Sequence, residues 1–97
     1  MTDEQTPDYL DYDAAEGFCD VTLSRQLTLK SGLAVESVRL REPTVDDQIR
    51  FQERKGSEAQ KEVGTFADLC ELAPEDIRSL RLKDYQRLQE AYQGFLN

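Results

Sequence analysis

The chain contains no histidine and no tryptophan among its 97 residues. Without imidazole side chains, the most common general base, the Ser-His dyads and most zinc sites are excluded. The five glycines stand singly, so there is no glycine-rich phosphate loop. Asp11 and Asp13 begin like a calcium loop, but Ala15 and Glu16 break its pattern. These absences argue against an enzyme, and we expect neither a metal nor another cofactor.

Cysteine is also scarce. Cys19 and Cys70 lie far apart and form no CxxC motif, so we interpret them as reduced cytosolic thiols rather than as a disulfide. Cys70 falls on the apolar side of a predicted helix, which favours a core position over a nucleophilic role.

Long apolar runs and an excess of positive charge are missing as well. No stretch approaches the ~18 apolar residues of a membrane span, and the N-terminus lacks the basic flank and apolar segment of a signal peptide. The net charge is −8, and residues 1–18 carry carboxylates but no Lys or Arg. Such a chain repels phosphate backbones and anionic lipid surfaces, so we expect neither nucleic acid nor a membrane as a partner.

The chain length allows one small domain. The acidic residues 1–18 show no sustained apolar period, and we predict a disordered, solubilising tail there, followed by a single domain over residues 19–97. An acidic arm whose aromatic residues fold onto a partner is the alternative. The sequence does not separate the two.

Apolar residues alternate with polar ones from Asp20 onward, which predicts a half-buried strand. They are Val21, Leu23, Leu27 and Leu29. Arg25 interrupts the alternation and indicates a bulge or a twist. A turn at residues 30–32, in which Gly32 can take a positive φ, leads to a second strand and completes a β-hairpin. A lone hairpin is marginal and has open edges, so it needs a cover, and self-association into a homo-oligomer stays open.

Helical patterns occupy the rest of the chain, and the predicted fold class is α+β, with three to four helices after the hairpin. Thr44 is placed to cap a helix over residues 45–55, with Val45 and Ile49 as its main apolar anchors. Ser57 is placed to cap a second helix.

The second predicted helix ends near residue 72, and its apolar residues step by four, three and four. They are Ala59, Val63, Phe66 and Cys70. Gly64 lies inside this helix, where it either permits close approach of another helix or is simply tolerated. Pro74 suits the first turn of a third, short helix.

The last predicted helix begins near residue 82 and has one apolar face, made by Tyr85, Leu88, Tyr92 and Phe95. For Tyr85 and Leu88 we favour a position in the domain's own core, whereas Tyr92 and Phe95 suit core and interface equally. The candidate partner-binding residues are Leu88, Tyr92, Phe95 and Leu96.

Three segments have a distinctive order and spacing: LREPT at residues 40–44, LAPED at 72–76 and LKDYQRL at 82–88. On these segments, residues 20–96 resemble the tail assembly chaperone family of long-tailed phages, which includes the Mu-like and P2-like proteins. The acidic N-terminal stretch is not a recognised part of that resemblance.

The resemblance implies a role in phage tail assembly. Proteins of this family bind the tape measure protein and keep it soluble before the tail tube forms around it, and they are absent from the finished virion. In many phages a translational frameshift makes a longer form that recruits the tail tube protein; this chain stops soon after its last helix, as the shorter form would. We therefore expect a protein of the host cytoplasm.

The net negative charge is also compatible with a second class of function. Small acidic phage proteins can imitate DNA and inhibit nucleases, and a net charge of −8 suits that role. The concentration of carboxylates in residues 1–18, rather than along a folded face, favours the chaperone interpretation.

Overall fold

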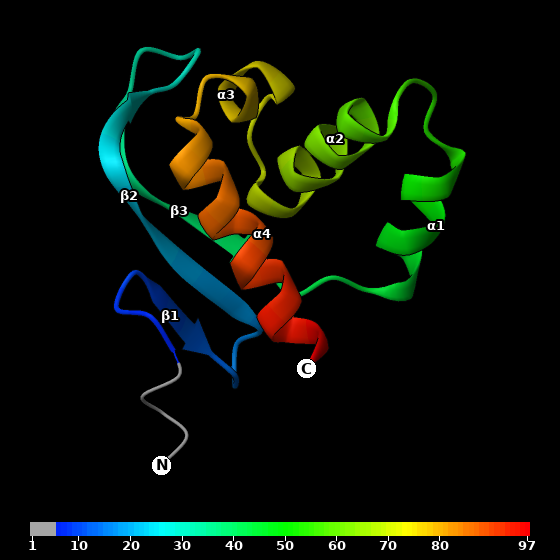
Figure 1. Cartoon of the computed structure of the whole chain (residues 1–97), viewed down its shortest axis with the longest axis horizontal. Helices are drawn as coiled ribbons and strands as arrows, with labels where there is room; N and C mark the ends of the chain where they lie inside the picture. The colour runs from blue at the N-terminus through cyan, green and yellow to red at the C-terminus, as the bar shows by residue number, and fades with distance from the viewer. Residues whose placement is uncertain (1–5) are drawn as a thin grey trace.

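The structure is a computed structural model that describes residues 6–97. Three antiparallel strands form a sheet in the order β1-β2-β3, and four helices follow (Figure 1). The strands are β1 (Leu10–Asp13), β2 (Phe18–Thr28) and β3 (Ala34–Arg41). The helices are α1 (Val45–Glu53), α2 (Glu58–Cys70), α3 (Pro74–Arg78) and α4 (Leu82–Leu96). The predicted α+β class, with its hairpin and helices, is confirmed.

The core lies between the sheet and the helices α2 and α4, which both contact it. Its most deeply buried side chains come from both layers and include Cys19, Val21, Leu40, Leu69 and Leu88. Figure 1 shows α4 running along the sheet, while α1 projects away on the far side of α2. Both cysteines are free, and Cys19 is fully buried. The reduced thiols predicted from their spacing match this arrangement.

The prediction of a disordered tail over residues 1–18 is wrong for its second half. Residues 10–13 form β1, which pairs with β2 from Leu10 opposite Val21 to Asp13 opposite Phe18. Leu10 is buried in the core. A strand of four residues is too short to show a period, so the acidic composition of the segment decided the prediction. Residues 1–5 of the predicted tail lie outside the described part of the chain.

Two tyrosines next to and within β1 attach it to α4. The Tyr9 hydroxyl donates to Glu90 Oε1 at 2.7 Å, and the Tyr12 hydroxyl donates to the Ala91 carbonyl at 2.9 Å. The guanidinium of Arg87 lies 4.1 Å from the centre of the Tyr9 ring. β1 therefore binds the sheet through its backbone and α4 through its aromatic side chains.

β2 contains the irregularity that Arg25 indicated. The pairing runs in register to Thr22 opposite Ser37 and resumes at Leu27 opposite Val35. Residues 23–26 of β2 therefore face Glu36 alone, which is a bulge of three extra residues. Leu23 and Leu27 are still both buried, so the bulge lengthens β2 without turning its apolar residues to solvent. The turn after β2 places Gly32 at φ +96°, as predicted.

Buried carboxylates bind the backbone groups that these irregular segments leave free. Asp84 of α4, only 1% exposed, accepts the N–H of Ser24 in the bulge at 2.8 Å. Asp76 of α3 is buried as well and accepts the N–H of Lys30 in the turn at 2.6 Å. An unpaired N–H at either place would cost free energy, so these two aspartates tie α3 and α4 to the distorted strand.

The LREPT segment forms the corner between β3 and α1. Leu40 is fully buried in the core, and Arg41 makes two parallel hydrogen bonds to Asp47, both 2.8 Å long. Thr44 caps α1 as predicted: its hydroxyl accepts the Asp47 N–H at 3.3 Å, while Asp47 Oδ2 accepts the Thr44 N–H at 2.8 Å. The segment therefore turns the chain from the sheet into the helices.

The predicted anchors of α1 are wrong. Val45 is 77% exposed and Ile49 47% exposed, whereas Asp47 is the buried residue of this helix. The helix is attached to the rest of the domain by the ion pair of Asp47 with Arg41 and by that of Arg50 with Asp68 of α2. The spacing of apolar residues predicted the wrong buried side for α1. The reason is that α1 contacts only α2 extensively and lies apart from the core.

The Arg41–Asp47 pair predicts an acid-dependent loss of stability. Hydrogen bonds from Arg41, and then from Thr44, hold the pKa of Asp47 at about 2, below its ordinary 3.8. Since the folded state holds the proton less tightly, this stabilisation is complete above pH ~4 and is lost as the pH falls toward 2. Asp47→Asn should lower the free energy of unfolding by about 1–2 kcal/mol at pH 6, and the difference should vanish near pH 2.

Urea denaturation at a series of pH values measures this difference. Asp46→Asn is the matched control, because Asp46 lies on the same helix with a side chain that is 67% exposed, and its difference from the parent should be small at every pH. A gap between parent and Asp47→Asn that is as large at pH 2.5 as at pH 6 would contradict the assigned role of the ion pair.

The second helix is confirmed with its Ser57 cap, whose hydroxyl accepts the Gln60 N–H at 3.1 Å. Of its predicted stripe, Phe66 is buried and Ala59 is exposed, because the first half of α2 extends beyond the sheet. Gly64 does permit a close approach, but by a side chain: a Cβ there would lie 2.8 Å from Arg54 Nη1. Arg54 is held in this place by its ion pair with Asp68.

Candidate functional site: an acidic groove between three helices

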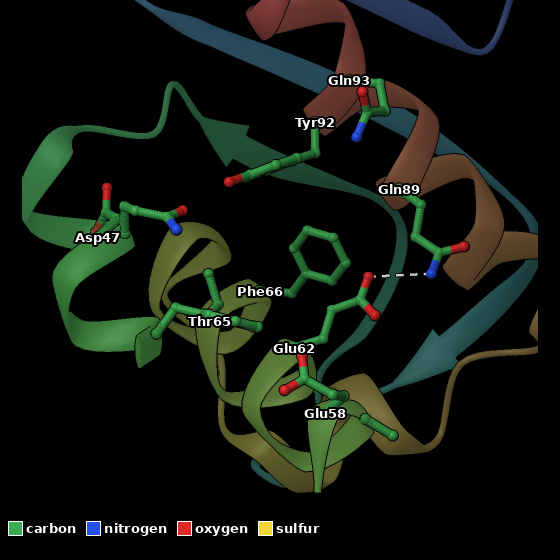
Figure 2. Close-up of a pocket in the computed structure, with 11 residues that line it drawn as sticks. Asp47, Glu58, Glu62, Thr65, Phe66, Gln89, Tyr92 and Gln93 are labelled. Carbon is green, nitrogen blue, oxygen red and sulfur yellow. Dashed lines mark hydrogen bonds between the residues drawn. The ribbon is translucent and has the colours of Figure 1, made fainter. Parts of the chain in front are cut away.

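A groove of about 600 Å³ lies between α1, α2 and α4. Figure 2 shows Asp47 on one side of it, Gln89 and Gln93 on the other and Phe66 between them. We call it the acidic groove. Its other lining residues are Gln48, Phe51, Glu58, Ala59, Glu62, Thr65 and Tyr92.

Aromatic rings form the apolar part of the acidic groove. Tyr92 reaches from α4 toward α1 (Figure 2), and its ring meets Phe66 edge-to-face with centroids 5.8 Å apart. Phe51 of α1 is half-buried on the opposite side, with the Lys61 ammonium 5.8 Å from its centroid. Half-exposed aromatic rings offer a large apolar contact area at little cost in side-chain entropy.

Carboxylates give one wall of the groove its charge. Glu58 and Glu62 follow each other by one turn of α2 and both line the groove. Glu62 accepts a hydrogen bond from Gln89 Nε2 at 3.0 Å (Figure 2), and within residues 6–97 it has no ion-pair partner. The nearest cation to Glu58 is Lys61, at 4.0 Å. Asp47 is already paired with Arg41, so the net negative charge lies on the α2 side.

This combination of an apolar floor and one anionic wall suits a particular ligand. An amphipathic helix can place its apolar stripe on the aromatic rings and Lys or Arg side chains beside Glu58 and Glu62. Among residues 6–97 no cluster of His, Cys, Asp or Glu is arranged to hold a metal ion. In the same part of the chain no helix is long and apolar enough to cross a membrane.

The four residues predicted to bind a partner lie in different places. Tyr92 lines the acidic groove. Leu88 is fully buried in the core, so its side chain is not accessible to a partner. Phe95 packs edge-to-face on Tyr12, with centroids 5.2 Å apart, and Leu96 is 58% exposed at the end of α4. The face was predicted as one surface, but β1 covers part of it, and a four-residue strand gave no sequence signal.

Sequence reasoning missed most of the groove. Phe66 was expected to serve the core alone, and Phe51, Glu58 and Glu62 were not identified. A signal did exist, since residues 47 and 51 on α1 and residues 58 and 62 on α2 are each spaced by one helical turn. This spacing does not reveal that α1 and α2 are separated in space. The groove exists only because of that separation.

The fold is that of a small α+β domain, in which a three-stranded sheet supports a helical layer with a groove between its helices. The family described as "Phage tail assembly chaperone proteins, E, or 41 or 14" matches residues 20–97 of the chain. The chain therefore belongs to the phage tail assembly chaperone family, a family with a non-catalytic role. Comparisons with curated proteins and with solved structures found no match.

The family match places the distinctive segments in a structural context. It includes LREPT, LAPED and LKDYQRL, which contribute the ion pair of Arg41 and the buried aspartates Asp76 and Asp84. The match begins at residue 20, after β1, the whole β1–β2 turn and the first two residues of β2. β1 is thus an element of this chain outside the matched region.

Proposed function

We propose that this protein binds the tape measure protein during tail assembly and holds a helix of that client in the acidic groove. The observation that carries the proposal is the groove itself: an aromatic floor beside one anionic wall, in a member of a tail assembly chaperone family. Tyr92 is the proposed apolar contact among the residues selected from the sequence. Glu58 and Glu62 are the proposed charged contacts.

The chemistry of the groove suits temporary binding. A client that must later enter the tail has to be released, and a half-exposed groove with solvated charges favours modest affinity and rapid exchange. The net charge of −8 would help to keep the loaded complex in solution. We further propose that the protein acts in the host cytoplasm, is left out of the virion, and has a longer frameshifted form that recruits the tail tube protein.

Co-expression with the tape measure protein of the same phage tests the proposal. The client should become soluble and co-elute with this protein in size-exclusion chromatography, which also gives the stoichiometry and the oligomeric state. The Glu58→Lys/Glu62→Lys variant should bind the client about tenfold more weakly, because two attractive charges become repulsive.

The matched control is Glu16→Lys/Glu36→Lys, which makes the same change of charge at two exposed positions outside the groove. This variant should retain client binding, and circular dichroism should show both variants folded. A client that stays insoluble with the parent protein would contradict the tape-measure role. Equal weakening in both variants would contradict the groove as the binding site.

A further inference from the structure

We propose that the opposite side of α2 is a second docking surface, which takes an acidic segment with apolar anchors from another protein. A groove of about 550 Å³ lies there between the first half of α2, α3 and the start of α4. We call it the cationic groove. Its apolar lining comes from Val63, Ile77, Leu80, Leu82 and Tyr85, and Arg78 stands at its side.

The apolar part of the cationic groove is incompletely covered. Leu82 is 71% exposed, although it is a large apolar residue in the first turn of α4. Val63, Leu80 and Tyr85 are half-buried, and the inner edge of Tyr85 meets Phe66 with centroids 5.5 Å apart. Burial and the neighbouring Glu62 raise the pKa of Tyr85. An apolar side chain of a partner can therefore be buried between Leu82 and the core.

The distribution of positive charge identifies the partner's chemistry. Within residues 6–97, seven of the twelve Lys and Arg side chains have a carboxylate partner and five have none. Four of these five belong to segments that form or adjoin the cationic groove. Arg78 lines the cationic groove, Lys55 lines an adjoining hollow that shares Val63 and Arg78 with it, and Arg81 and Lys83 flank Leu82 in the chain.

No carboxylate lies among the described residues that line the cationic groove or this adjoining hollow. In a chain of net charge −8, unpaired cations around an apolar groove form an exception to the general field. They complement acidic side chains beside apolar ones, and repel the basic helix proposed for the acidic groove. Ala59 of α2 lines both grooves, so the first half of α2 separates two surfaces of opposite charge.

Two synthetic helical peptides test this assignment without the tape measure protein. Both carry the same leucine stripe; one is flanked by glutamates and the other by lysines. In fluorescence anisotropy the glutamate peptide should bind the protein, and Arg78→Glu should weaken it at least tenfold. Leu82→Ser should also weaken it, because the apolar anchor is lost while the charge is kept.

Arg25→Glu is the matched control, because Arg25 is the fifth unpaired cation and lies in the β2 bulge, outside both grooves. It should leave binding of the glutamate peptide unchanged. Equal weakening by Arg25→Glu and Arg78→Glu would show a response to net charge only, and would overturn the proposal. No effect of Leu82→Ser would overturn it too, as would a failure of the glutamate peptide to bind.

The proposal stands apart from the tape-measure role. Binding of the lysine peptide should be lost in Glu58→Lys/Glu62→Lys and kept in Arg78→Glu, so each groove is tested by its own peptide. Competition between the two peptides for one site would overturn the assignment of two surfaces. Sedimentation of the protein alone distinguishes a second copy of this chain as the occupant, and a concentration-dependent dimer broken by Leu82→Ser would also overturn it.

Discussion

Replacing Asp84 with alanine is expected to lower the free energy of unfolding by about 3 kcal/mol. Asp84 is almost fully buried and accepts the Ser24 N–H at 2.8 Å, and Arg87 Nε lies 3.9 Å from the same oxygen. Alanine leaves the N–H of the β2 bulge without its acceptor and removes the carboxylate beside Arg87. In a domain of this size the melting temperature should fall by roughly 12–24 °C.

Thermal and urea denaturation measure this loss. Asp84→Asn should cost clearly less than Asp84→Ala, because the amide oxygen can still accept the Ser24 N–H. Asp46→Ala is a control for the loss of an aspartate from an exposed ion pair on a helix, and should cost no more than about 0.5 kcal/mol. If Asp84→Ala costs no more than Asp46→Ala, then the carboxylate does not hold the bulge.

Gly94→Ala is expected to destabilise the protein by about 2 kcal/mol, although Gly94 lies on the surface of a helix. Alanine at an exposed helical position normally stabilises by up to about 1 kcal/mol relative to glycine. Here a Cβ would overlap the Tyr12 hydroxyl and lie 2.7 Å from Tyr12 Cζ. The hydroxyl is itself fixed by its hydrogen bond to the Ala91 carbonyl. The steric cost therefore exceeds the gain in helix propensity.

A double-mutant cycle separates the two effects. In a Tyr12→Ala background the overlap is gone, so Gly94→Ala should become neutral or stabilising, and the sign of its effect should reverse. A stabilising Gly94→Ala in both backgrounds would show that Tyr12 does not lie against α4. The cycle thus tests directly whether β1, which lies outside the family match, docks on the helix.

The family segments serve mainly to build the scaffold. In LREPT, Leu40 fills the core and Thr44 caps α1, while Arg41 pairs with a buried carboxylate of that helix. In LAPED and LKDYQRL, Asp76 and Asp84 bind the backbone of the turn and of the bulge. These segments therefore fix how the helices stand relative to the sheet. The grooves that we propose as binding surfaces are a consequence of that placement.

The local sequence determined which elements form. The alternation of Val21, Leu23 and Leu27 gave the long strand, and caps at Thr44 and Ser57 gave the start of two helices within one residue. Such features depend on a few neighbouring residues. The alternation of a strand is a pattern within one segment, and capping bonds and turn conformations form between residues a few positions apart. The same reasoning gave the bulge its place, since Arg25 interrupts an otherwise regular pattern.

Tertiary structure alone decided what each element covers. Periodicity identifies an apolar face but not the neighbour that buries it, so it wrongly predicts Val45 and Ile49 as anchors of a helix that lies away from the core. β1 pairs with the nearby β2, but it is attached to α4 by hydrogen bonds that Tyr9 and Tyr12 donate to residues about 80 positions away. The two grooves likewise arise from the separation of helices. The positions of the helices in space also decide on which face of the molecule the charged side chains lie.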